Sequence, residues 1–376
     1  MTPEPAAPRG DLRLGGLMAE GVSPWLEGVS RDRISSGYLA RLVAETGIRG
    51  ATTDPVTLLR ALTGTTAYRG QLARLAGRCA TAEAALRELL VRDAQAACDE
   101  LRGVFEETGG GDGLVSVDLD PRHVHDAAAT VEDAEAVTEA VGRPNVLVKI
   151  PATAEGLDAI SACIGRGIGV HVTEIFSPHR YGAVVAAYFD GLERALASGR
   201  ELSAIVSVAS LSVGRLDAEV DARLDALGTP EARALRGEAG LATARLAYEV
   251  YEERLGLGRW RPLRAAGARP QRLAWTDTSV TGPPPARTRY VDRLVAWSTV
   301  TLLSPPVIEA AVLHSRLQGD TLTGEAKAAR TVWDRLERAG VPHDTVTAKL
   351  EADGLRRLVT LRRRLLSAVA GGPGGA

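Results

Sequence analysis

Lys149 raises the first chemical question in this sequence. It lies in an apolar run from Val146 to Ile150, closed by Pro151, and this pattern predicts a buried strand. A buried ammonium is costly unless it is paired or deprotonated. The chain has 45 lysines and arginines, and just three of them are lysines: Lys149, Lys327 and Lys349. Because lysine, unlike arginine, can become a neutral amine, Lys149 is a candidate nucleophile toward a ketone or aldehyde.

Other polar residues stand at the ends of similar apolar runs: Glu27, Asp54, Asp118, Thr173, Ser210, Asp277 and Ser304. Side chains alternate along a strand, so Leu147 would share the face of Lys149, and His171 that of Thr173. An amine close to carboxylates suits Schiff-base chemistry, in which a carboxylate moves protons during imine formation and bond cleavage. The alternatives are that each acidic residue caps the helix after it and that Lys149 is a paired structural residue.

The elements that must position these residues are strands alternating with helices. Eight strand-like segments are expected at 23–28, 47–55, 113–121, 144–152, 167–177, 202–210, 271–278 and 300–304. Alternation of this kind predicts a parallel sheet, and eight units predict a single (β/α)8 (TIM) barrel, whose chemistry lies at the carboxyl ends of the strands. An open doubly wound sheet is the alternative, but no Gly-rich phosphate fingerprint follows the first strand.

Composition and local sequence patterns indicate a single domain and argue against several classes of protein. We expect disordered tails at 1–14 and 371–376, and one domain at 15–370 that ends in helices packed on the barrel. The formal charge of −2 argues against a nucleic-acid surface, and the longest apolar runs are too short for a membrane span. The first residues lack the apolar region of a signal peptide. Three cysteines without C-x-x-C spacing predict reduced thiols in the cytoplasm, and the six histidines form no metal-binding motif.

Longer segments carry a resemblance to a known family. They are "SRDRISSGYLARLV" (30–43), "KIPATAEGLDAI" (149–160), "IFSPHRY" (175–181), "SVASLSVGRLDAEVDARLDALG" (207–228), and "RLAYEVYEE" with "GARPQR" (245–253 and 267–272). Over roughly residues 15–310 the sequence resembles transaldolase, in its bacterial branch with long C-terminal helices. The resemblance implies a (β/α)8 barrel, a Schiff base at Lys149, a small-molecule carbonyl substrate, and no cofactor or metal.

The resemblance also implies catalytic roles. Asp118 and Thr173 would hold a water that relays protons during imine formation, and Glu27 would handle the proton of the bond-breaking step. Glu27 stands where the family has Asp, and Asp118 stands where it has Glu. Each position therefore keeps a carboxylic acid, but the side chain is longer at Glu27 and shorter at Asp118 than in the family.

The positions that would bind substrate depart further from the family. The six positions are Asp54, His171, Ser210, Ser212, Arg215 and Asp277, of which Ser210 and Arg215 are retained and the other four differ from the family. Asp54 and His171 replace asparagines, and Ser212 replaces an aromatic residue. At the phosphate end Asp277 replaces a serine and Thr281 replaces a lysine, while Arg215 is retained. We expect Arg215 to pair with Asp277.

This pattern predicts a divergent transaldolase-like enzyme that makes or breaks a C–C bond beside a ketone or aldehyde. Its substrate would be unphosphorylated or amine-bearing and would belong to specialised metabolism. One alternative is an ordinary pentose-phosphate transaldolase that transfers dihydroxyacetone between sugar phosphates. The other is a catalytically silent barrel that binds a metabolite. The residues leave the oligomeric state open.

Overall fold

The computed structural model describes residues 14–280 and 284–371, and its centre is a closed barrel of eight parallel strands. The strands are β1 Val22–Val29, β2 Gly50–Thr53, β3 Leu114–Asp118, β4 Val146–Pro151, β5 Val170–Ile175, β6 Ser207–Ser212, β7 Arg272–Thr276 and β8 Thr299–Leu303. Each pairs with its neighbours in the chain, and β8 closes the ring on β1. The predicted (β/α)8 barrel is confirmed.

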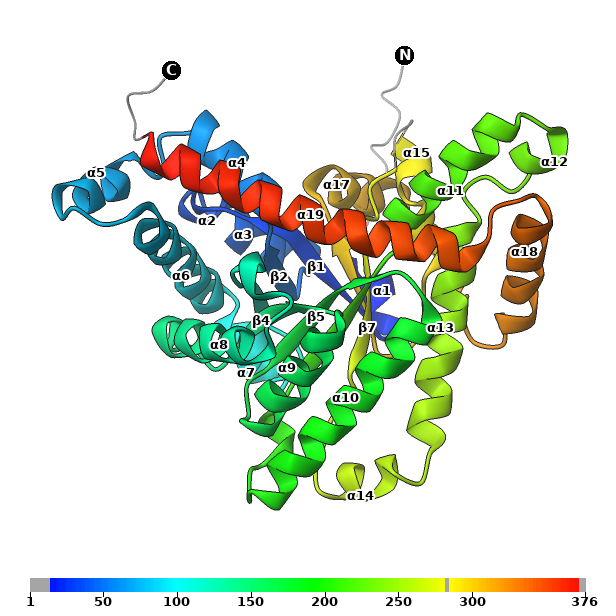
Figure 1. Cartoon of the computed structure of the whole chain (residues 1–376), viewed down its shortest axis with the longest axis horizontal. Helices are drawn as coiled ribbons and strands as arrows, with labels where there is room; N and C mark the ends of the chain where they lie inside the picture. The colour runs from blue at the N-terminus through cyan, green and yellow to red at the C-terminus, as the bar shows by residue number, and fades with distance from the viewer. Residues whose placement is uncertain (1–13, 281–283, 372–376) are drawn as a thin grey trace, which may run out of the picture.

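Helices surround the barrel in the described part of the chain (Figure 1). They are α1 Gly15–Ala19, α2 Arg31–Ser35, α3 Tyr38–Arg41, α4 Pro55–Gly64, α5 Arg69–Gly77, α6 Ala82–Glu100, α7 Arg102–Glu107, α8 Ala127–Val141, α9 Ala154–Gly165, α10 Pro178–Ala197, α11 Val213–Leu227, α12 Pro230–Arg233, α13 Ala239–Gly256, α14 Trp260–Ala265, α15 Pro284–Arg287, α16 Arg289–Arg293, α17 Pro305–His314, α18 Ala326–Arg338 and α19 His343–Ala370. Short turns of other helix types are η1 Leu42–Thr46, η2 Pro121–His123 and η3 Leu202–Ala204. None of these helices is long and apolar enough to cross a membrane.

Local sequence signals start the helices that follow several of the strands. After β2, the Asp54 carboxylate accepts a hydrogen bond from the Thr57 N–H, and Pro55 takes the first helical position, where no N–H is needed. After β4, the Thr153 hydroxyl accepts from the Gly156 N–H at 2.8 Å. These caps set the short loops that carry the site.

The barrel interior is filled below the site by large apolar side chains. They are Trp25, Leu114, Leu147, Val206, Val208, Ala274, Val300 and Leu302. Trp25 is fully buried, and a Cβ on Gly50 would lie 2.5 Å from its ring. The glycine on β2 is therefore what admits the indole. Because this layer is packed, a ligand can enter from the carboxyl ends of the strands but cannot pass through the barrel.

Several boundaries differ from the sequence prediction, and two of the differences are informative. The sixth strand covers 207–212 rather than 202–210, because residues 202–204 form the turn η3 before the chain enters the barrel. The predicted tails lie outside the described residues, except for Leu14 and Gly371. Leu14 is buried in the main core, so the core begins one residue earlier than expected.

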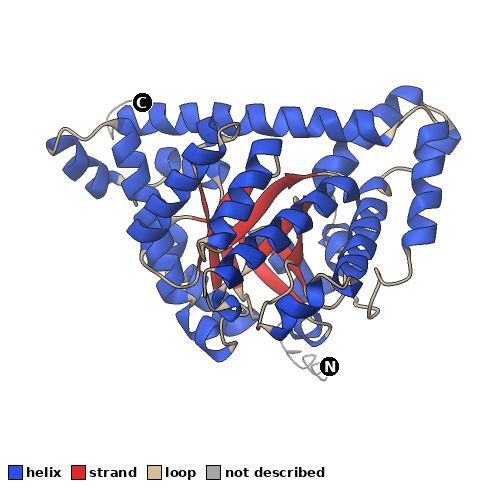
Figure 2. Cartoon of the chain, turned by 60° about the horizontal axis from the view of Figure 1, so that its bottom comes forward, coloured by secondary structure: helices blue, strands red, loops and turns tan. Residues whose placement is uncertain are grey.

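The last helix, α19, crosses one end of the barrel (Figures 1 and 2). It packs against α4, α6, α11 and β5, elements that lie far from it in sequence. The end that it crosses is the one where the strands finish, because its residues share a cavity with Lys149.

Candidate active site

A cavity opens at the carboxyl ends of the strands beneath α19. Its wall includes every residue that the sequence assigns to catalysis or substrate binding: Glu27, Asp54, Asp118, Lys149, His171, Thr173, Ser210, Ser212, Arg215 and Asp277. Ser304, the remaining strand-end residue, is absent from this wall, and its hydroxyl lies 2.8 Å from that of Ser279. The strand order thus gathers residues from seven strand ends into one site.

Lys149 occupies the centre of a short polar chain. Its side chain is 13% exposed, and its Nζ lies 3.3 Å from Oδ1 of Asp118. The same nitrogen donates a hydrogen bond to the backbone oxygen of Thr53. The Thr53 hydroxyl donates to Oδ2 of Asp118 at 2.6 Å, so the carboxylate is held from both sides. Asp118 therefore compensates the charge of the lysine and is placed to take its proton.

Glu27 is a half-buried acid whose pKa lies well above its ordinary value. Burial and the nearby negative charges of Asp277 and Asp54 raise its pKa to about 8, against the smaller opposing effects of Thr276 and Lys149. The Thr276 hydroxyl lies 3.1 Å from Oε1 of Glu27. Glu27 can thus donate a proton near pH 7, and its ionised form can accept one.

His171 lies beside Lys149 on the next strand, pointing into the barrel. Its Nδ1 is 2.7 Å from the Ser116 hydroxyl, and its Nε2 is hydrogen-bonded to the Ser210 hydroxyl. The imidazole meets Trp25 edge to face, with ring centroids 6.3 Å apart. Burial and the charge of Lys149 lower its pKa to about 3, so the ring is neutral at physiological pH.

Arg215 does not form the expected pair with Asp277. Its Nη1 lies 3.1 Å from Oε2 of Glu174, and its guanidinium lies over the Phe176 ring at 4.9 Å. Asp277 instead accepts a hydrogen bond from the Ser212 hydroxyl. The prediction of an Arg215–Asp277 pair was wrong because Glu174 competes successfully for the guanidinium.

Glu174 is a residue of the site that the sequence reasoning missed. Strict alternation along β5 turns it away from Thr173 and out of the barrel. The register slips between Val172 and Ile175, and Glu174 adopts a left-handed φ of 57°. This bulge brings the carboxylate into the cavity, where burial raises its pKa despite the opposing charge of Arg215.

Asp54 is both a helix cap and part of the cavity wall. It caps α4 through the Thr57 N–H and hydroxyl, both at 2.8 Å, and it also lines the cavity. The helix-cap alternative is therefore correct for Asp54, and its carboxylate still adds negative charge beside Glu27.

Helix α19 supplies the outer wall, which the sequence reasoning also missed. Gly354, Arg357, Leu358 and Leu361 face the same cavity as Lys149. A second, more apolar cavity adjoins it between α19 and the loops after β2 and β3, sharing Lys149 and Asp118. Leucines from α4, α6 and α19 line this second space: Leu58, Leu86, Leu90, Leu358 and Leu365.

No group of three His, Cys, Asp or Glu side chains able to hold a metal ion occurs within residues 14–280 and 284–371. What the site offers chemically is an amine within reach of a carboxylate, a protonated acid, and several hydroxyls. That set can form an imine, protonate a leaving hydroxyl and move a proton to or from a substrate hydroxyl.

Comparison with known proteins gives consistent matches along nearly the whole chain. The family model described as Transaldolase/Fructose-6-phosphate aldolase matches residues 24–367. A protein named Transaldolase 1 from Streptomyces avermitilis is 46% identical over 354 residues, which cover 94% of each chain. The Transaldolase of Acidothermus cellulolyticus is 44% identical over 356 residues, covering 95% of each chain. That of Thermobifida fusca is 46% identical over 354 residues, covering 94% of this chain and 96% of its own.

Proposed function

The chain belongs to the transaldolase/fructose-6-phosphate aldolase family, and from this premise we propose that it transfers a dihydroxyacetone unit between sugars through a Schiff base on Lys149. The observation that carries the proposal is the contact of 3.3 Å between the Lys149 amine and the Asp118 carboxylate inside a cavity. The relatives' names favour this ordinary reaction over one on a non-standard substrate.

Imine formation is the first step that these residues would perform. Asp118 accepts the proton of the Lys149 ammonium, directly or through a water on Thr173, and the free amine attacks the ketose carbonyl carbon. The same carboxyl group then returns the proton to the carbinolamine hydroxyl, which leaves as water. The product is a protonated imine, which withdraws electrons from the adjacent carbon.

Bond cleavage is the second step, and we assign its proton to Glu27. In its ionised form the Glu27 carboxylate accepts the proton of the substrate hydroxyl. The C–C bond then breaks, an aldehyde leaves, and the electron pair remains as an enamine on Lys149. Addition of the enamine to a second aldehyde and hydrolysis of the new imine complete the transfer.

Trapping with borohydride tests the proposal. We expect incubation with fructose 6-phosphate and borohydride to add the reduced three-carbon unit to Lys149, detected by mass spectrometry of the peptide. Lys149→Ala should lose both the adduct and turnover with erythrose 4-phosphate as acceptor. Lys327→Ala, which removes a lysine outside the cavity, is the control. Turnover of Lys149→Ala within tenfold of wild type would contradict the proposal.

A second candidate is the same chemistry on an unphosphorylated or amine-bearing substrate of specialised metabolism. Its supporting observation is that Glu174 pairs with Arg215 while Asp277 adds a further negative charge to the same end of the cavity. The comparison that decides between the candidates is kcat/KM for fructose against fructose 6-phosphate.

We also propose a cytoplasmic location. Its support is that Cys79, Cys98 and Cys163 are all free thiols, which suits a reducing compartment.

A further inference from the structure

The positive charge of Arg215 is already compensated. Nη1 of Arg215 lies 3.1 and 3.3 Å from the two oxygens of Glu174, and these side chains are 20% and 14% exposed. A phosphate that approached Arg215 would meet the Glu174 carboxylate and, close by, Asp277. Repulsion between like charges at such range amounts to several kcal/mol when water is partly excluded, so this end of the cavity disfavours a dianion.

The approach to Arg215 is also covered by α19. Gly354 lies directly on the ion pair, because a Cβ added to it would lie 1.8 Å from Oε2 of Glu174 and 3.1 Å from Nη2 of Arg215. A glycine at this point allows the helix backbone to rest on the pair. An anionic group on the substrate must therefore find its counter-charge elsewhere.

Arg357 provides a second positive charge at the same cavity, near enough to Glu174 to attract its carboxylate but not paired with it. It follows Gly354 by three residues, about one helical turn, and both residues line the cavity that holds Lys149. Within the described part of the chain Arg357 makes no hydrogen bond or ion pair. It is therefore available for a ligand, unlike Arg215.

A basic groove continues outward from Arg357 between α4 and α19. Arg357 and Leu361 line both the cavity and this groove, so the two spaces adjoin. Arg60 and Arg364 also line the groove, and neither makes an ion pair within the described residues. Arg356 lies there as well, but Asp353 holds it. Three available guanidinium groups thus mark a path from solvent to Lys149.

From this arrangement we infer that Arg357, supported by Arg60 and Arg364, binds the phosphate of a substrate whose carbonyl carbon reacts at Lys149. The inference rests on the proposed sugar transfer and names the group that selects phosphorylated substrates. Planar guanidinium forks match a phosphate dianion, and their three charges outweigh its two. The substrate would lie with its carbonyl at β4 and its phosphate under α19.

The test compares Arg357→Gln with Arg363→Gln, a matched loss of charge from the same helix at an exposed position that lines neither cavity. We expect Arg357→Gln to lower kcat/KM for fructose 6-phosphate by about tenfold or more, the usual effect of losing a charged hydrogen bond, and to leave kcat/KM for fructose within twofold. Arg363→Gln should leave both values unchanged. Equal effects of the two substitutions on fructose 6-phosphate would overturn the inference.

Inorganic phosphate gives a readout that does not depend on turnover. Phosphate should raise the Tm of wild type and Arg363→Gln, and should raise that of Arg357→Gln less. An equal rise in all three proteins would overturn the inference even if no sugar is turned over. Failure of the proposed function would appear differently, as the absence of a borohydride adduct on Lys149.

The double variant Glu174→Gln/Arg215→Gln tests the rival site. It removes both charges of the buried pair together, so neither is left uncompensated. We expect the preference for fructose 6-phosphate over fructose to stay within twofold of wild type. A tenfold loss of that preference would place the phosphate at Arg215 and overturn the inference.

Discussion

At the scale of single residues, Glu27 sets the pH dependence of the site. In the proposed mechanism cleavage requires its carboxylate, and its pKa is raised to about 8 by burial and by Asp277 and Asp54. We therefore expect kcat/KM to rise with pH until about 8 and then level off, since kcat/KM reports the ionisation of the free enzyme. Glu27→Gln should remove this rise and leave residual activity independent of pH between 6 and 9. A wild-type profile already flat from pH 6 would contradict the assignment.

The same carboxyl group also affects stability. Its folded pKa of about 8 lies above the ordinary 4.5, so the folded state holds the proton more tightly, and stability is lost as pH rises from 4.5 through 8. Glu27→Gln should therefore gain stability relative to wild type at pH 9 but not at pH 4.5. The gain is on the order of a few kcal/mol, because each pH unit between the two pKa values contributes about 1.4 kcal/mol. Urea unfolding at both pH values measures it.

The pKa of His171 is shifted in the opposite direction, so its effect on stability changes with pH in the opposite sense. Its folded pKa of about 3 lies below the ordinary 6.5, so the folded state keeps the ring neutral. The stability that this provides is full above pH 6.5 and is lost as pH falls toward 3. His171→Asn should lower stability at pH 7 by about 1–3 kcal/mol, through the lost Ser116 and Ser210 contacts, yet lose less on acidification. His125→Asn, at an exposed ring, should change neither quantity.

Prediction from sequence succeeds at this scale where regular geometry holds. The strand ends and their alternation place Lys149, Asp118 and His171 together without further information. Prediction fails at Glu174, because a one-residue bulge reverses the face of the strand on which a side chain lies. The residues around Glu174 do not predict that bulge. The wrong partner for Arg215 follows from the same bulge.

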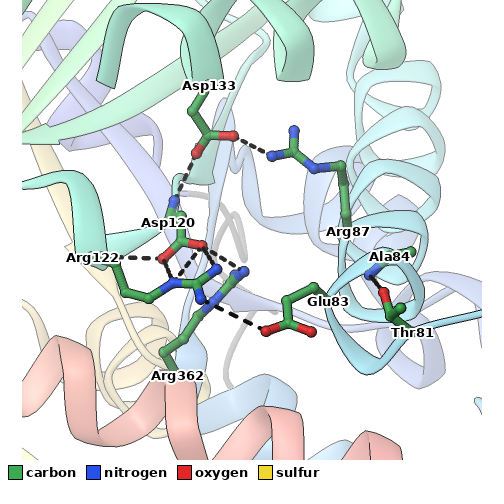
Figure 3. A network of polar contacts seen from close by, with 8 residues as sticks. All are labelled: Thr81, Glu83, Ala84, Arg87, Asp120, Arg122, Asp133 and Arg362. Carbon is green, nitrogen blue, oxygen red and sulfur yellow. Dashed lines mark hydrogen bonds and ion pairs between the residues drawn. The ribbon is translucent and has the colours of Figure 1, made fainter. Parts of the chain in front are cut away.

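At the scale of elements, α19 is held on the barrel by a buried ion-pair network (Figure 3). Asp120, in the loop after β3, accepts from Arg362 of α19 at 2.8 Å and from Arg122 at 2.6 Å. Its N–H donates to Asp133, which also pairs with Arg87. The network ties α6, α8 and α19 to one loop of the site.

Removing the helix's part of this network should loosen α19. Asp120 is 5% exposed and Arg362 is 12% exposed, whereas Arg122 is 52% exposed. Arg362→Met should therefore cost about 3 kcal/mol, the usual penalty for breaking a buried pair, and Arg122→Met clearly less. Faster hydrogen exchange confined to α19 would report the loosening. Similar losses from both substitutions would show that the network does not hold the helix.

Gly354 is the point where α19 comes closest to the barrel. Gly354→Ala should cost about 1–3 kcal/mol, because its Cβ would lie 1.8 Å from Glu174. Gly103→Ala in α7, where an added Cβ meets nothing within 4 Å, is the control and should be neutral or stabilising. Glu174→Ala should recover most of the loss in a double-mutant cycle. Strictly additive effects would contradict direct contact.

At the scale of the whole molecule, the barrel could be predicted from the sequence, but the position of α19 over the site could not. Eight apolar runs separated by helices predict a parallel sheet, and their number favours a closed barrel over an open sheet. The arginines of α19 form the polar side of an amphipathic helix, a pattern equally typical of a helix that faces solvent. Its position over the site depends on contacts such as Asp120–Arg362, which join residues 242 positions apart. Periodicity cannot report contacts at that separation.

The crossing of α19 over the barrel has a consequence for how the enzyme is made. The ribosome adds residues in order, so all eight strands leave it before α19 does. If Lys149 is the nucleophile we propose, a nascent barrel would present it to small aldehydes before Arg357 and Leu361 of α19 are in place. During refolding, Trp25 fluorescence should recover before turnover of a phosphorylated sugar. The enzyme would then become selective only at the end of its synthesis, when α19 docks over Lys149.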